Sequence, residues 1–292
     1  MRRVMQLLPL ALILCVRLAV AQQRTINVGD VVINYDVSGR SGPAVVFIHG
    51  WSHNLSVWDD QVAALNSRYR IVRFDSRGYG KSSGYSDPSA DPQDLLTLLE
   101  ALHIPRAYIV GHSRGGDVAL RFAAAYPQRV SGLILEGAFP EGFPAPPEIG
   151  QFFASLSTVA KTNGLDSAGK LLLTNQIAWV PPGRNDITER YRHLWSTYSG
   201  KDLTNPQPES HRVPVPTTDQ IRNLRVPTLV IVGDHEAPFI AAADDSLARW
   251  IPGAKKVVIP NAGHGAHFAQ PASFNSALMD FIYSVERNKP KK

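Results

Sequence analysis

A serine lies at the centre of the segment Gly111–Gly115 (GHSRG), and its surroundings make it a candidate nucleophile. The segment follows a short apolar run at residues 107–110 and precedes a helical stretch that Pro127 ends. Such a sharp strand-to-helix turn exposes the Ser113 hydroxyl at the carboxyl edge of a sheet, and the glycines leave room for the turn. The Arg114 backbone N–H starts the helix without a partner and is placed to stabilise an oxyanion. The pattern therefore predicts nucleophilic attack on a carbonyl carbon.

A serine hydroxyl needs a histidine base that is itself oriented by a carboxylate. Of nine histidines, His264 follows the last strand-like run and precedes a helix that begins near Pro271, which places it at the same sheet edge as Ser113. It also completes the chain order serine, acid, histidine. We expect His267 to pack nearby or to support the site. Four other histidines precede the acid and are expected to make loop hydrogen bonds: His49, His53, His112 and His235.

The acid has three candidates. Asp234 and Glu236 follow the apolar run at residues 228–232, and only one of them can face His264. Glu136 ends the run at residues 132–135. A zinc site made from His264 and His267 lacks a third ligand at a useful spacing, so we expect neither a metal nor another cofactor.

The elements that must position these residues alternate along the chain. Residues 25–28 and 31–35 read as a strand pair joined by Gly29-Asp30, so the sheet is expected to open with antiparallel strands. Helical stretches at residues 92–102 and 114–126 then alternate with apolar runs, which indicates a parallel sheet. The runs suit strands that are buried on both faces: residues 44–48, 71–74, 107–110, 132–135, 228–232 and 256–259.

Five motifs in this order resemble the α/β-hydrolase superfamily: residues 49–51 (HGW), 75–82 (DSRGYGKS), 111–116 (GHSRGG), 233–236 (GDHE) and 263–264 (GH). The resemblance covers residues 25–283 except an insertion, and it implies a mostly parallel sheet flanked by helices with a mostly helical cap. It implies Trp51 as the second backbone donor of the oxyanion hole. Relatives usually carry aspartate where Glu236 stands, so the resemblance favours Glu236 as the acid, with Asp234 at a variable acidic position. Glu136 stays open, since some members supply the acid from that strand end.

The nucleophile narrows the expected reaction. Relatives that open epoxides or remove halide carry aspartate at the elbow, where this chain has Ser113. We therefore expect cleavage of a carboxylic ester or lactone, a small-molecule substrate, through an acyl-enzyme. A peptidase, an amidase or a carbon–carbon bond hydrolase could share the triad, and a perhydrolase side reaction is also compatible with it. The alternative of another class is a non-catalytic ligand-binding receptor with the same fold.

The first residues have the layout of a secretory signal peptide: two arginines, an apolar run at residues 4–16 and Ala19-Val20-Ala21. We expect export to the periplasm or the medium, with residues 1–21 removed and no stable membrane insertion of the mature chain. Cys15 follows Leu14, where lipoprotein processing needs a small residue, so lipidation is disfavoured. The mature chain would then contain no cysteine.

The charge balance disfavours nucleic acid as a partner. Without the three arginines of the expected signal peptide, 27 basic residues stand against 25 acidic ones, a net charge of +2 without a basic stripe. We expect a hydrolase core at residues 22–138 and 217–286, a cap at 139–216 and a basic tail at 287–292. The oligomeric state is left open. Aromatic cap residues are expected either to line an apolar pocket or to form the cap's own core: Phe139, Phe143, Phe152, Phe153, Trp179, Tyr191 and Trp195.

Overall fold

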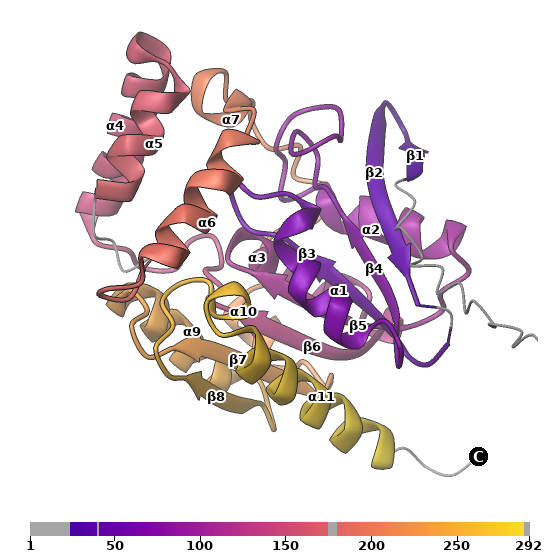
Figure 1. The fold of residues 1–292 in the computed structure, drawn as a ribbon. Coiled ribbons are helices and arrows are strands. Elements are labelled where there is room, and N and C mark those ends of the chain that lie inside the picture. The colour runs from indigo at the N-terminus through magenta and orange to yellow at the C-terminus, as the bar shows by residue number, and fades with distance from the viewer. Residues whose placement is uncertain (1–23, 40, 175–179, 289–292) are drawn as a thin grey trace, which may run out of the picture.

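The computed structural model describes residues 24–39, 41–174 and 180–288. Their eight strands form one sheet with the order β1-β2-β4-β3-β5-β6-β7-β8. β1 pairs with β2 and β2 with β4 in antiparallel fashion, and every other pair is parallel. The predicted mostly parallel sheet with an antiparallel start is therefore confirmed (Figure 1). The strands are β1 (Arg24–Val28), β2 (Val31–Ser38), β3 (Ala44–Ile48), β4 (Arg70–Phe74), β5 (Ala107–His112), β6 (Val130–Glu136), β7 (Thr228–Gly233) and β8 (Lys255–Ile259).

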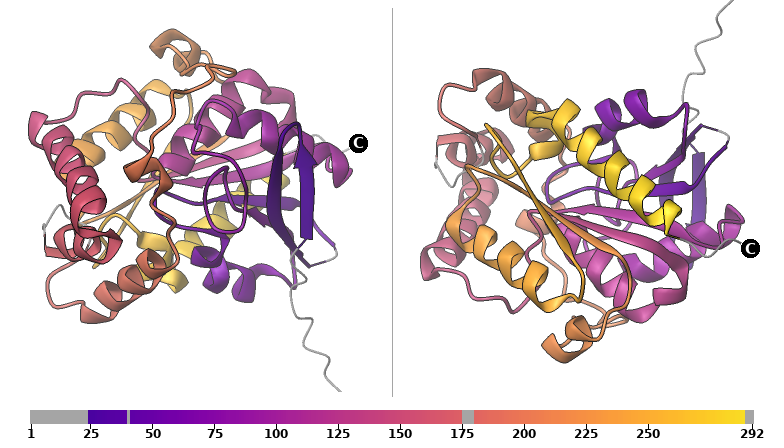
Figure 2. Two further views of the ribbon diagram at one scale, coloured as in Figure 1. Left: turned by 90° about the horizontal axis from the view of Figure 1, so that it is seen from above. Right: turned by 90° about the horizontal axis from the view of Figure 1, so that it is seen from below.

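Helices cover both faces of the sheet (Figure 2). α2 (Asp91–Ala101), α3 (Arg114–Ala125) and α9 (Pro238–Trp250) bury their apolar sides in one core cluster. α1 (Asp59–Leu65) and α11 (Pro271–Arg287) contribute to the cluster on the opposite face. The two faces follow from strand alternation, because Ile109 of β5 belongs to the first cluster while Tyr108 and Val110 belong to the second.

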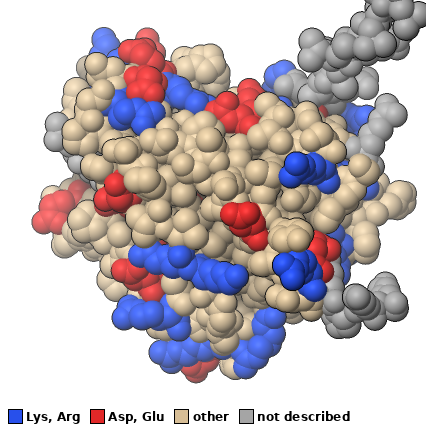
Figure 3. Space-filling view, turned by 60° about the horizontal axis from the view of Figure 1, so that its bottom comes forward, with Lys and Arg blue, Asp and Glu red and all other residues tan. Residues whose placement is uncertain are grey.

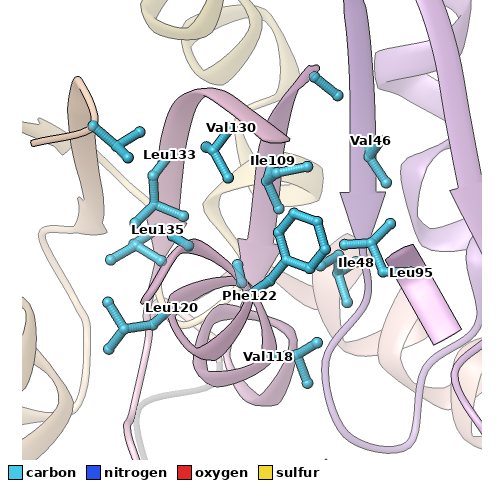
Figure 4. Packing of buried hydrophobic residues seen from close by; sticks show 14 of the residues in the cluster. Val46, Ile48, Leu95, Ile109, Val118, Leu120, Phe122, Val130, Leu133 and Leu135 are labelled. Carbon is cyan, nitrogen blue, oxygen red and sulfur yellow. The ribbon is translucent and has the colours of Figure 1, made fainter. Parts of the chain in front are cut away.

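The central strands are held by the packing of α3. Phe122 of α3 points toward the sheet and lies between Ile48 of β3 and Ile109 of β5 (Figure 4), and Val118, one turn earlier on the helix, belongs to the same cluster. All four side chains are fully buried. Burying one such side chain contributes roughly 1.5–3 kcal/mol. This packing gives the nucleophile a rigid base, because Ser113 joins β5 directly to α3.

One strand differs from the expectation of burial on both faces. β8 is the last strand of the sheet, its two lysines are exposed, and Val258 is 52% exposed. Only one neighbour, β7, pairs with it. An edge strand has no second partner, so the apolar run at residues 256–259 did not by itself indicate its position.

The predicted cap region contains four helices, α4 (Pro147–Asn163), α5 (Leu165–Thr174), α6 (Asn185–Ser196) and α7 (Lys201–Thr204). They lie above the carboxyl edge of the sheet (Figure 1). The short α8 (Thr218–Arg222) then leads back to β7. Phe152, Leu156 and Trp195 of this region belong to a third core cluster, which also includes Tyr79 from the loop after β4.

No helix among residues 24–39, 41–174 and 180–288 is long and apolar enough to cross a membrane. The expected signal peptide and Cys15, like most of the expected basic tail, lie outside the described residues. On the face drawn in Figure 3, Lys and Arg side chains are interspersed with Asp and Glu. This mixed surface agrees with the charge pattern of the sequence.

Candidate active site

The turn between β5 and α3 has the geometry that the sequence predicts for a nucleophile elbow. Ser113 has φ 53° and ψ −119°, a strained conformation for a residue with a side chain. A Cβ on Gly111 would lie 2.2 Å from the Gly115 carbonyl oxygen, and one on Gly115 would lie 2.4 Å from the Ile48 carbonyl oxygen. Both obstacles are backbone atoms that cannot move aside, so glycine is needed at each position.

Ser113, His264 and Glu236 form a hydrogen-bonded chain. The Ser113 Oγ lies 2.8 Å from Nε2 of His264, and Nδ1 of His264 lies 2.9 Å from a carboxylate oxygen of Glu236. The His264 and Glu236 side chains are only 3% and 1% exposed. The carboxylate accepts a hydrogen bond from the Nδ1–H of His264, which keeps the proton on Nδ1 and presents the lone pair of Nε2 to the serine hydroxyl. The geometry can therefore generate a serine alkoxide at the moment of attack.

Two loops at the carboxyl edge of the sheet deliver the histidine and the acid. Glu236 follows β7 directly, and His264 lies in the loop between β8 and α10 (Ala266–Ala269). The backbone N–H of His235 donates to the Ala262 carbonyl at 2.9 Å, which ties the two loops together. The other oxygen of Glu236 accepts the Ala237 N–H at 2.8 Å. The two loops are thus joined by a main-chain hydrogen bond, and the Glu236 carboxylate is held by a backbone N–H before any substrate binds.

The alternative acid Asp234 faces away from the hydrogen-bonded triad of Ser113, His264 and Glu236. Its carboxylate lies 2.6 Å from Nδ1 of His235 and accepts the Ala262 N–H at 3.2 Å, and both side chains are substantially exposed. The structure therefore pairs His264 with Glu236 and leaves Asp234 to brace the loop.

The other alternative, Glu136, contacts His267 rather than His264. One of its oxygens accepts the His267 backbone N–H at 2.8 Å, and the second lies 2.7 Å from the His267 ring Nδ1. Burial raises the pKa of Glu136 to about 8 and lowers the pKa of His267 well below its ordinary value. These two pKa shifts together imply that the Glu136 carboxyl is protonated and that the His267 imidazole is neutral.

Glu136, His112 and His267 also bring three possible metal-ligating atoms within 4.8 Å of one another. This set contains His267 but has His112 in place of His264, so it is not the pair considered from the sequence. The second Glu136 oxygen and Nδ1 of His267 lie 2.7 Å apart, but neither atom makes a hydrogen bond to a described residue. The hydrogen bond that holds Glu136 in this cluster is the one from the His267 backbone N–H to its other oxygen.

The protonated state of Glu136 predicts how stability depends on pH. Its pKa rises from an ordinary 4.5 to about 8 on folding, so the folded chain keeps a proton that the unfolded chain releases. This contribution is complete below about pH 4.5 and is lost as the pH rises toward about 8. Glu136→Gln keeps the hydrogen-bonding groups and removes the titration. The variant should therefore match the wild type near pH 5 and exceed its melting temperature increasingly up to about pH 9.

Thermal melts of both proteins across this pH range measure the effect. The buried histidines titrate equally in both proteins and cancel in the comparison. A difference in melting temperature that stays constant with pH would show that Glu136 is ionised in the folded chain.

Two histidines assigned to loop hydrogen bonds lie instead in a buried layer of rings under the nucleophile. His53 stacks on His112 with centroids 5.6 Å apart, and His112 lies 4.8 Å from the His264 ring. Burial holds the pKa of both His53 and His112 well below the ordinary value, so both rings are neutral. Their sequence neighbours did not predict this stacking, because it joins His53, in the loop after β3, to His112, the last residue of β5. His49, by contrast, makes the expected loop bonds, to the Gly50 carbonyl and the Ser76 N–H.

The two expected oxyanion donors lie on either side of the nucleophile. Arg114 is the first residue of α3, so its N–H has no partner within the helix. Trp51 follows β3 in the loop that touches the elbow, since a Cβ on Gly50 would lie 3.3 Å from the Ser113 Cβ. Neither N–H donates to another described residue. Both amides are therefore available for a carbonyl oxygen under attack.

A cavity of about 650 Å³ opens over Ser113 and His264. Trp51 and the cap residues Phe153, Leu172 and Tyr191 contribute to its walls. Residues 180–184 form a further part of the cavity wall. The sequence did not predict this role, because the pattern of these residues does not differ from that of an ordinary turn. Arg184 is the one lysine or arginine among the lining residues that the structure describes, and its guanidinium is paired with Asp186 at 2.7 Å.

Four of the seven aromatic cap residues take one of the two expected roles. Phe153 and Tyr191 line the cavity, whereas Phe152 and Trp195 belong to the cap's own core. Phe139 lies 5.9 Å from Phe143 and 5.3 Å from Phe239 of α9, away from the cavity. Trp179 lies outside the described residues.

Comparison with known proteins gives a consistent set of matches. The family model of the alpha/beta hydrolase fold matches residues 43–271. Among curated proteins, 3-oxoadipate enol-lactonase 2 of Acinetobacter baylyi is 26% identical, over 87% of this chain and 94% of its own. The pimeloyl-(acyl-carrier protein) methyl ester esterase of Nitrosomonas europaea is 28% identical, over 84% of this chain and 98% of its own. Among solved structures, Est816, described as an N-acyl homoserine lactone degrading enzyme, superimposes with a TM-score of 0.73 at 27% identity, over 88% of this chain and all of its own.

Proposed function

Because the chain belongs to the alpha/beta hydrolase fold family, we propose that it is a serine hydrolase that cleaves a carboxylic ester or lactone through an acyl-enzyme on Ser113. The observation that carries the proposal is the hydrogen-bonded chain from the Ser113 hydroxyl through His264 to Glu236 at the floor of a cavity. The lactonase and esterase activities named for relatives support the same substrate class.

The residues then act in a simple order. His264 takes the proton of Ser113 as the oxygen attacks the carbonyl, and the negatively charged Glu236 stabilises the imidazolium that forms. The Trp51 and Arg114 amides donate to the oxyanion of the tetrahedral intermediate. His264 next protonates the leaving alkoxide, and water activated by the same histidine releases the acid.

The cavity favours uncharged substrates. Its apolar wall of Phe153, Leu172 and Val180 suits an acyl chain, and its one guanidinium, on Arg184, is already paired with Asp186. A substrate carboxylate would lose its hydration there without gaining a free cation.

Two nitrophenyl esters of equal chain length test both the function and this preference. The hexanoyl ester is expected to be hydrolysed with a higher kcat/KM than the adipoyl monoester, which differs by one terminal carboxylate. Stoichiometric labelling by a fluorophosphonate should block both reactions. Labelling without turnover of any ester, lactone or amide would favour a ligand-binding receptor, and faster turnover of amides would favour an amidase.

We also propose that the chain is exported, on the strength of the arginine-led apolar segment and the Ala19-Val20-Ala21 that follows it. Fractionation of expressing cells followed by N-terminal sequencing tests this proposal. A cytoplasmic protein that retains residues 1–21 would contradict it.

A further inference from the structure

A single carboxylate in the cap collects three hydrogen bonds next to the oxyanion loop. Asp202 of α7 accepts the indole N–H of Trp51 at 2.8 Å and the hydroxyl of Tyr79 at 2.9 Å. Its other oxygen accepts the hydroxyl of Tyr198. Trp51 and Tyr79 belong to the hydrolase core, whereas Tyr198 belongs to the cap. Asp202 is therefore a direct link between the two regions.

The indole of Trp51 is enclosed by aromatic rings from the cap. Phe153, Trp195 and Tyr198 surround it edge-on, at centroid distances of 5.3, 5.8 and 5.6 Å. The hydrogen bond to Asp202 selects one orientation of the indole within this enclosure, because the ring has only one N–H. The side chain of the residue expected to donate one oxyanion amide is thus fixed by the cap.

The second oxyanion residue is connected to the same carboxylate. The guanidinium of Arg114 lies 5.0 Å from the centre of the Tyr79 ring and is paired with buried Asp91 at 2.7 Å. Tyr79 is 1% exposed and also contacts the His49 ring at 5.4 Å. Tyr79 therefore stands between Arg114 and the Asp202 carboxylate. Both residues that are expected to donate the oxyanion amides are anchored, through their side chains, in one network.

From this convergence we propose that Asp202 is a positioning residue, which holds the Trp51 loop so that the oxyanion hole is complete only while the cap is docked. The inference rests on the proposed function, because the oxyanion hole matters only if Ser113 attacks a carbonyl. Asp202 touches no reacting atom and acts through the indole of Trp51. Two further hydrogen bonds hold the cap to the core beside Asp202. The Asn54 amide donates to the Thr197 hydroxyl at 2.9 Å, and the Ser199 hydroxyl donates to the Gly78 carbonyl at 3.2 Å.

The test compares Asp202→Ala with Asp202→Asn and with the surface control Glu189→Gln on cap helix α6. Loss of one oxyanion donor costs about 100-fold to 1000-fold in kcat, so a displaced donor should cost Asp202→Ala about 10-fold or more with little change in KM. Asp202→Asn keeps an acceptor for the indole and should recover most of the rate. Glu189→Gln should match the wild type, since its partner Arg192 lies on the surface of the same helix.

A tetrahedral inhibitor separates positioning from general damage to the fold. An alkyl boronic acid adduct on Ser113 places an oxygen in the oxyanion hole, whereas the alcohol product of the ester has no carbonyl oxygen to place there. Asp202→Ala should weaken boronic acid inhibition by about the factor lost in kcat and leave inhibition by the alcohol product unchanged. Equal weakening of both inhibitors, or full activity of Asp202→Ala, would overturn the proposal.

A double-mutant cycle with Trp51→Phe tests the route through the indole. Trp51→Phe removes the N–H and retains an aromatic ring, so adding Asp202→Ala to it should cost little further rate. Fully additive losses would show that Asp202 acts by another path. Wild-type protein that neither labels with fluorophosphonate nor hydrolyses any ester would overturn the proposed function itself, and this inference with it.

Discussion

Ser113→Ala is expected to reduce ester hydrolysis by about 10⁴-fold to 10⁶-fold, the loss seen when the nucleophile of a serine triad is removed. The Ser113 hydroxyl lies 2.8 Å from Nε2 of His264, the base that would take its proton. Steady-state kinetics with the hexanoyl ester and fluorophosphonate labelling both measure the effect. Labelling should disappear together with turnover.

The fold of this variant should be unchanged. Alanine introduces no new atom at the strained turn, and β5 and α3 on either side are held by buried packing that does not involve the hydroxyl. Its melting temperature should therefore equal that of the wild type, with Ser155→Ala on the exposed face of α4 as the matched control. Full turnover by Ser113→Ala would remove the basis of the mechanism.

Glu236→Gln is expected to lower kcat by about 10⁴-fold, as loss of the triad carboxylate does in serine proteases. The amide is nearly isosteric, but it removes the negative charge that stabilises the His264 imidazolium and allows the ring to adopt the wrong tautomer. The 2.9 Å contact is almost fully buried, so solvent cannot replace the carboxylate. Rates measured at several pH values separate this effect from a shifted pH optimum.

Asp234→Asn and Glu136→Gln are the matched controls, because they neutralise the two other candidate acids. Asp234 braces an exposed loop and Glu136 already carries a proton, so neither change should approach the loss caused by Glu236→Gln. A larger loss for Asp234→Asn than for Glu236→Gln would reassign the acid. A larger loss for Glu136→Gln would place the acid on β6.

The sequence left three carboxylates as candidates for the triad acid, and the structure shows which of them contacts His264. Asp234 and Glu236 are two residues apart in a turn, and which of them faces inward depends on how the β7 and β8 loops are tied together. The backbone contacts from Asp234 to Ile259 and from His235 to Ala262 set that arrangement. These contacts join segments that are more than 20 residues apart, so no local pattern reveals them.

The sequence alone determined the sheet, its antiparallel start, the elbow and the expected order of nucleophile, acid and base. These features depend on local periodicity and on glycine positions, which a short window of residues contains. Tertiary structure alone decided the edge position of β8, the neutral layer of His53 and His112, the Glu136–His267 pair and the bond from Asp202 to Trp51. The last pair is separated by 151 positions in the chain. Such contacts depend on how the cap and the loops are brought together in space, and side-chain chemistry at one position does not specify its distant partner.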